Sequence, residues 1–254
     1  MKLGAQLYSL REHCDAPEKL KETLKRVKEM GYDIVQASTI CEIDPVLLKS
    51  YIDEYNIPVG CTHRIFNEIV NETDKCINFH KTIGCQVIGL GALPGEYRNS
   101  YEALLEFRDK IAPAIKKIND AGLTFAYHNH AFDFAPVGDT TIMEFFIEKI
   151  PEAHFIFDVY WAKFAGKSVE DYIRRLTKLG RLNHIHFKDM LTEPEGPICA
   201  CGDGVIDFEY ISSLCRECNI ENVYVEQDNA PTFPDAFVEM EKSYNHLYKM
   251  VKEK

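Results

Sequence analysis

Residues 155–188 read FIFDVYWAKFAGKSVEDYIRRLTKLGRLNHIHFK and contain the pattern that decides the fold. The stretch begins with a short apolar run at 155–159, continues with an amphipathic segment at 169–179 that Gly180 ends, and closes with a second short run at 182–188. Short apolar runs on either side of a helix-length amphipathic segment are typical of two parallel strands joined by a helical crossover. The stretch therefore predicts one strand–helix–strand unit of a parallel sheet.

The same alternation extends outward to both ends of the chain. The predicted strands are residues 2–8, 34–37, 58–63, 86–90, 123–129, 155–159, 182–188 and 223–227, and the predicted helices are residues 17–30, 45–55, 75–83, 101–121, 141–150, 169–179, 208–218 and 236–251. Eight such units in 254 residues match the size of a closed barrel. A doubly wound open sheet is disfavoured because no G-x-G-x-x-G motif follows the first predicted strand. We therefore predict an α/β protein that is a single (β/α)8 TIM-barrel domain over residues 1–254.

The composition has an acidic balance that excludes several kinds of partner. There are 29 basic and 40 acidic residues, so the formal net charge is −11. Because nucleic acids and anionic membranes are bound mainly by Lys and Arg, neither is an expected partner. No apolar run reaches the roughly 18 residues that a membrane-spanning helix needs. The N-terminal residues lack the apolar core of a signal peptide, and nine scattered cysteines, an odd number, predict reduced thiols in the cytoplasm.

Ionisable residues gather where predicted strands five to eight end. In a barrel, the carboxyl ends of the strands and the loops that follow them form the reactive face. Asp158, His186 and Glu226 come one from each of three consecutive strands, so their side chains can converge. Buried charges are costly unless they are paired or bind a metal, and two carboxylates with an imidazole suit Mn, Co, Zn or Fe better than Ca. For each residue alone, the alternative is a buried hydrogen-bonding role.

Other polar residues at strand ends are candidates for contacts with a substrate. His63 ends the third predicted strand, where it could contact substrate or serve packing. Trp161, the only tryptophan, lies three residues after Asp158 and could form an apolar wall against a sugar. Gln6 and Tyr8 end the first predicted strand and could line the far side of the mouth.

Alternation along the seventh predicted strand places His186 and Lys188 on one face. Lys188 could bind a substrate oxygen or pair with Glu226. We expect Arg64 and Asp189 to form a surface pair. No cluster of Arg and Lys marks a phosphate site, so the sequence does not support a phosphorylated substrate.

Several segments together resemble the xylose isomerase-like TIM-barrel superfamily, in its sugar phosphate isomerase/epimerase branch. They are GAQLYSLRE near the start, YHNHAFDF on strand five, FDVYWAKFAG on strand six, HIHFKDM on strand seven, GDGVIDF before the next helix and VEQD on strand eight. The resemblance covers essentially the whole chain. It implies the barrel fold and one divalent metal, and it is a weak guide to the substrate, because the superfamily includes epimerases, isomerases, inosose dehydratases, ketosugar lyases and endonucleases.

The resemblance also implies a set of metal ligands. Members typically bind the metal with Glu, Asp, His and Glu from strands five, six, seven and eight. Asp158, His186 and Glu226 match three of these by position, whereas His128 occupies the place of the first Glu. An imidazole binds the same metals, so His128 is the candidate fourth ligand. Asp133, five residues further on, is a second candidate for the missing carboxylate and otherwise for substrate binding.

These observations predict a divalent-metal-dependent sugar isomerase or epimerase that acts on a keto-sugar or polyol through an enediolate. The metal would be one ion of Mn, Co, Zn, Fe or Mg, and the candidate catalytic groups are Glu226, His128, His130 and Lys188. A lyase or dehydratase is the runner-up, because the same enediolate would expel a leaving group β to the carbonyl.

Two further alternatives stay open. An endonuclease IV-like nuclease is disfavoured by the net charge of −11. A non-catalytic sugar-binding barrel would follow if the missing Glu reflected a decayed site. The expected partner is a small-molecule sugar, and the sequence is compatible with a homo-oligomer.

Overall fold

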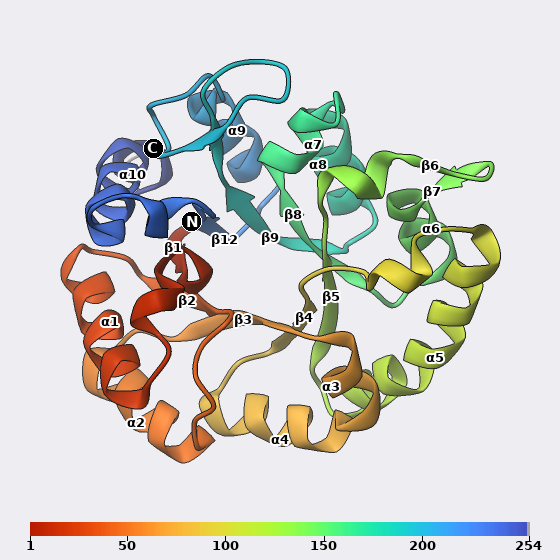
Figure 1. Ribbon diagram of the computed structural model, residues 1–254, viewed down its shortest axis with the longest axis horizontal. Coiled ribbons are helices and arrows are strands. Elements are labelled where there is room, and N and C mark those ends of the chain that lie inside the picture. The colour runs from red at the N-terminus through yellow and green to blue at the C-terminus, as the bar shows by residue number, and fades with distance from the viewer. Residues whose placement is uncertain (253–254) are drawn as a thin grey trace.

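The computed structural model describes residues 1–252 and contains a closed barrel of eight parallel strands (Figure 1). In chain order the barrel strands are β1 (Lys2–Gln6), β2 (Ile34–Ala37), β3 (Val59–Arg64), β4 (Val87–Leu90), β5 (Thr124–His128), β8 (His154–Asp158), β9 (Leu182–Phe187) and β12 (Asn222–Val225). Each pairs with the next, and β12 pairs with β1 to close the ring. The predicted (β/α)8 TIM barrel is confirmed.

Helices surround the barrel on the outside, as Figure 1 shows. They are α1 (Pro17–Glu29), α2 (Pro45–Tyr55), α3 (Phe66–Asn71), α4 (Thr73–Ile83), α5 (Tyr101–Asp120), α6 (Ile142–Lys149), α7 (Val159–Phe164), α8 (Val169–Lys178), α9 (Phe208–Glu217) and α10 (Ala236–Lys252). Among the described residues, no helix is both long and apolar enough to cross a membrane. The short helices α3 and α7 were not predicted, because both begin within two residues of the end of a strand and are too short to show a helical period.

The loops at the carboxyl ends of the strands carry additional short elements. The first predicted strand stops at Gln6 and continues as a 3-10 helix, Leu7–His13, so Tyr8 lies in the loop and not in the sheet. Two small antiparallel sheets form within other loops, one from β6 (Pro136–Val137) and β7 (Thr140–Thr141) and one from β10 (Asp189–Met190) and β11 (Ile198–Cys199). These additions shape the face where the polar residues gather.

An apolar plug fills the barrel interior beneath that face. The plug consists of Ile34, Cys61, Val87, Ala126, Ile156 and Tyr224, all buried. The large ring of Tyr224 fits because Gly4 has no side chain, since a Cβ there would lie 2.5 Å from Cδ1 of the ring. Packing of this kind is expected for a small barrel, whose interior is a core and not a pore. The polar residues above the plug therefore have access to solvent from one end only.

The end of β8 illustrates how the fold directs one side chain into this face. Asp158 is the last residue of β8 and also the N-cap of α7, and its Oδ1 accepts the backbone N–H of Trp161 at 3.1 Å. An Asp in this place satisfies one of the free N–H groups of the first helical turn. The cap fixes Oδ1 on the helix and leaves Oδ2 for other contacts.

Candidate active site

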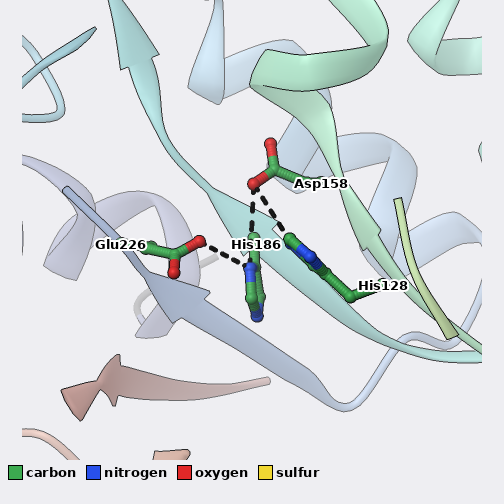
Figure 2. A group of neighbouring side chains, drawn as sticks. All are labelled: His128, Asp158, His186 and Glu226. Carbon is green, nitrogen blue, oxygen red and sulfur yellow. Dashed lines mark hydrogen bonds and ion pairs between the residues drawn. The ribbon is translucent and has the colours of Figure 1, made fainter. Parts of the chain in front are cut away.

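Four side chains predicted as metal ligands converge on the carboxyl face of the barrel (Figure 2). His128 ends β5, Asp158 ends β8, His186 lies on β9 and Glu226 directly follows β12, so the four come from adjacent strands. One potential ligand atom from each lies within 4.8 Å of the others, and all four residues are buried. We call these four residues the cluster.

The contact between His128 and Asp158 brings two electron-pair donors together. Nδ1 of His128 lies 3.1 Å from the carbonyl oxygen of Gly91, to which it donates a hydrogen bond. In the neutral ring the lone pair is then on Nε2, which lies 3.5 Å from Oδ2 of Asp158. Nε2 of His128 has no hydrogen-bond partner, and the polar contact of Oδ2 of Asp158 is its ion pair with Nζ of Lys188 at 3.1 Å. Two facing acceptors can hold a cation between them, so this arrangement can accommodate a metal ion.

His186 is oriented by groups on both sides of its ring. Nδ1 lies 2.9 Å from Oε2 of Glu226 and 3.7 Å from Oδ2 of Asp158, while Nε2 lies 2.6 Å from Oε1 of Gln36 on β2. Burial alone would lower the pKa of His186, but Glu226 and Asp158 raise it to about 9. A ligating His commonly donates its second N–H to a fixed acceptor, and Gln36 is placed for that role. Sequence reasoning missed Gln36, whose only signal is a polar residue inside an apolar strand.

Lys188 places a buried ammonium beside the carboxylates. Its Nζ lies 3.1 Å from Oδ2 of Asp158, 2.9 Å from Oε2 of Glu226 and 3.1 Å from Oδ1 of Asp228. Burial would lower the pKa of Lys188, but the three carboxylates raise it well above its ordinary value. Burial would conversely raise the pKa values of Asp158 and Glu226, and Lys188 is the main group that holds both well below their usual range. The structure thus forms the Lys188–Glu226 pair and adds Asp228, which sequence reasoning did not select.

A pocket of about 360 Å³ opens above the cluster. Six of the predicted site residues line it, namely Tyr8, His63, His128, His130, Lys188 and Glu226. Burial lowers the pKa of His63 well below its usual range and that of His130 to about 2, so both rings are neutral at physiological pH. Each keeps one ring nitrogen without a partner, Nε2 in His63 and Nδ1 in His130. These free nitrogens can bind hydroxyl groups.

Three predicted residues outside the cluster, Gln6, Trp161 and Asp133, do not line this pocket. Gln6 is fully buried, and its Oε1 accepts the N–H of Tyr8 at 3.3 Å while Nε2 has no partner. Trp161 lies beside the pocket, with its ring 5.1 Å from Nζ of Lys188. The prediction that Asp133 could replace the missing ligand or contact substrate does not fit the structure.

The carboxylate of Asp133 accepts hydrogen bonds from one residue of β5 and one residue of the loop that follows it. It accepts the hydroxyl of Tyr127 and the backbone N–H of His130, each at 2.6 Å, and it is fully buried outside the cluster. Burial raises its pKa to about 7. Asp133 therefore shapes the loop that carries His130, and His128 occupies the fourth position of the cluster.

The predicted surface pair of Arg64 and Asp189 is also wrong. Asp189 is fully buried, because a carboxylate at this position organises the loop that follows β9. It accepts backbone N–H groups of Met190, Gly202, Gly204 and Ile206 at 2.8–3.1 Å. The guanidinium of Arg64 instead lies over the ring of Phe79, 4.3 Å from its centroid.

Comparisons with known proteins agree with this architecture. A sugar phosphate isomerase/epimerase from Parabacteroides distasonis is 20% identical, with a TM-score of 0.80 over 99% of this chain and 94% of that chain. The probable 3-DHS dehydratase AsbF from Bacillus anthracis is 12% identical, with a TM-score of 0.76 over 98% and 99% of the two chains. The IOLI protein with a bound zinc atom is 16% identical, with a TM-score of 0.73 over 100% and 99%. At these identities the likeness concerns the fold.

Sequence comparison is more specific about the family. No curated protein shows significant similarity to this chain. The family model described as xylose isomerase-like TIM barrel matches residues 24–249, which include every strand of the barrel except β1. The chain therefore belongs to the xylose isomerase-like TIM barrel family.

Proposed function

We propose that this protein is a divalent-metal-dependent isomerase or epimerase of a keto-sugar or polyol. The observation that carries the proposal is that Nε2 of His128, a buried atom with no hydrogen-bond partner, lies 3.5 Å from Oδ2 of Asp158. Together with His186 and Glu226 they offer two nitrogen and two oxygen ligands, a set that suits Mn, Co, Zn or Fe. When bound, such a metal polarises adjacent carbonyl and hydroxyl oxygens and so makes the neighbouring C–H more acidic.

Glu226 is the group we assign to proton transfer. It lines the pocket, and Lys188 and His186 keep its carboxyl ionised by holding its pKa well below the usual range despite burial. A carboxylate with so low a pKa is a weak base, so it removes a proton only from a strongly polarised substrate. Return of the proton by Glu226 to the neighbouring carbon gives isomerisation. Epimerisation needs a second group that delivers a proton to the opposite face of the same carbon, and the predicted catalytic residues His128 and His130 are the candidates.

The remaining pocket residues bind and orient the substrate. The neutral rings of His63 and His130 offer unpartnered nitrogens to hydroxyl groups. The ammonium of Lys188 is already shared by three carboxylates, and the guanidinium of Arg64 lies over Phe79. Of these two cations on the lining, Lys188 is thus already shared, and Arg64 also lies 3.9 Å from Glu68. The lining therefore has no cluster of Arg and Lys that would mark a phosphate site, so we propose an uncharged sugar as substrate.

Elimination is the second candidate reaction. The resemblance implies a Glu on strand five and a Glu on strand eight, whereas here His128 occupies the place of the first. With Glu226 as the only Glu of that pair, loss of a leaving group β to the carbonyl competes with proton return. This reaction would make the protein a dehydratase or lyase acting on a keto-sugar or inosose.

The test is proton exchange in D2O. The protein is loaded separately with Mn, Co and Zn and incubated with ketoses, inososes and 3-keto-glycosides, and deuterium next to the carbonyl is measured by NMR. We expect uptake with at least one class, and Asp158→Asn and His186→Ala should abolish it. Exchange with inversion supports the epimerase, and accumulation of an enone supports the lyase. Exchange with none of the compounds, or failure of the wild type to bind any of the metals, would refute the proposal and favour a non-catalytic sugar-binding barrel.

A further inference from the structure

Asn129 lies at a gap in the hydrogen-bonding ladder beneath the cluster. The ladder between β5 and β8 ends at the pair of His128 with Ile156, two residues short of Asp158. On the other side of β8, the ladder to β9 continues to the pair of Asp158 with His186. Glu226 is likewise held by its backbone, since its N–H donates to the carbonyl of Phe187 at 3.0 Å. Only on the β5 side does Asp158 lack a backbone partner from the neighbouring strand.

The carboxamide of Asn129 fills this gap. Its Oδ1 accepts the backbone N–H of Asp158 at 2.8 Å, and its Nδ2 donates to the backbone carbonyl of the same residue at 3.2 Å. Asn129 is fully buried and follows the last residue of β5. A primary amide has the donor and acceptor of a peptide group, so this side chain continues the β5–β8 pairing where the two backbones part.

We propose that Asn129 is a positioning residue that sets the direction of the Asp158 carboxylate. Its two bonds fix the backbone of Asp158, and the cap bond from the N–H of Trp161 to Oδ1 fixes one carboxylate oxygen at 3.1 Å. With both restraints in place, Oδ2 faces Nε2 of His128. The inference rests on the proposed function in so far as it treats Asp158 as a metal ligand.

The required chemistry explains why the residue is asparagine. Aspartate would keep the acceptor but lose the donor, and its charge would face the carbonyl of Asp158. Leucine has a similar size and can make neither bond. Asn129→Leu therefore removes both hydrogen bonds while it keeps the volume of the side chain, and Asn129→Asp removes only the donor.

The first test measures metal binding with Mn²⁺ as the probe, by the EPR signal of free ion. Groups that orient ligands typically change metal affinity about 10–100-fold. Asn129→Leu should weaken Mn²⁺ binding at least tenfold in the wild-type background and cause no further loss when Asp158→Ala is present. Equal affinity of wild type and Asn129→Leu, or the same fold loss in both backgrounds, would overturn the proposal.

Two further variants control for general damage to the fold. Asn229→Leu removes a bond of 2.7 Å to the carbonyl of Ile198 in the same face and should leave Mn²⁺ affinity within about twofold, because Asn229 contacts no cluster residue. Asn129→Ser replaces Asn129→Leu if the larger side chain prevents folding, and it should show the same dependence on Asp158.

A second readout does not depend on metal. Without added metal, the amide hydrogen of Asp158 should exchange with D2O at least tenfold faster in Asn129→Leu than in wild type, while that of Phe187 should not change. Equal exchange rates at Asp158 would overturn the positioning role even if the wild type binds Mn²⁺. Failure of the wild type to bind any metal would refute the proposed function alone, and the exchange rates would still decide the role of Asn129.

Discussion

The side-chain oxygen of Gln36 lies 2.6 Å from Nε2 of His186, although 150 positions separate the two residues in the chain. The bond crosses from β2 to β9, which are not neighbours in the barrel. Because this bond holds Nε2 against Gln36, Nδ1 of His186 faces Asp158 and Glu226.

We expect Gln36→Leu to weaken metal binding because the ring of His186 loses the acceptor that orients it. The expected loss in Mn²⁺ affinity is about 10–100-fold, measured by EPR or calorimetry. Gln36→Glu keeps an acceptor oxygen and should recover most of the affinity. Gln86→Leu, an exposed position before β4, serves as the matched control. A Gln36→Leu protein with wild-type affinity would show that His186 is oriented without this bond.

Lys188→Met should change stability and metal binding in opposite directions. Without added metal, loss of the ammonium leaves Asp158, Glu226 and Asp228 without their shared cation, and breaking a buried ion pair costs about 3–5 kcal/mol. The same change removes a positive charge close to two proposed ligands, so a divalent cation should bind more tightly. The rise in melting temperature on adding Mn²⁺ should therefore be larger than in wild type. A smaller rise would mean that Lys188 supports metal binding.

Asp133 should make the free energy of unfolding of the wild type decrease as the pH rises from 4 to 8. Burial raises its pKa from 3.8 to about 7, so the folded protein binds more protons there than the unfolded chain in this interval. The stabilising contribution of protonated Asp133 is complete below about pH 4 and is lost as the pH rises through about 7. Relative to Asp133→Asn, the free energy of unfolding of the wild type should fall by on the order of 1–4 kcal/mol, measured by urea denaturation. A constant difference across the interval would contradict this.

Asp189→Asn should loosen the loop between β9 and α9. The carboxylate accepts four backbone N–H groups, and an amide would turn a donor toward some of them. We expect a loss of about 1–3 kcal/mol in the free energy of unfolding and faster hydrogen exchange confined to residues 189–206. Asp203→Asn, an exposed aspartate in the same loop, should change neither quantity. Unchanged exchange in Asp189→Asn would mean that other contacts hold the loop.

The sequence predicted those parts of the structure that follow from local pattern. Each barrel strand is a short apolar run, and each longer helix has apolar residues at helical spacing, so the alternation was visible directly. Because parallel strands end on one face, residues at four consecutive strand ends were expected to meet, as His128, Asp158, His186 and Glu226 do.

The residues that sequence reasoning missed act through contacts that depend on closure and register. Gln36 meets His186 only because the barrel closes and points both side chains inward. Asn129 has a partner because the β5–β8 ladder ends early, and no pattern in the chain reports where a ladder ends. The sequence analysis expected Asp133 to bind a metal or substrate and Asp189 to lie at the surface. Both expectations failed because a carboxylate that binds backbone N–H groups looks the same in sequence as one that is free for other contacts.

The plug around Tyr224 closes the lower end of the pocket above it. A ligand can enter and leave only through the opening at the carboxyl ends of the strands. One ligand must therefore leave before the next can bind. For the proposed reaction, the product would therefore leave by the same opening through which the substrate enters. Substitutions in the loops around this opening can therefore alter which ligands bind and how fast they leave, while the packed interior continues to hold the barrel strands together.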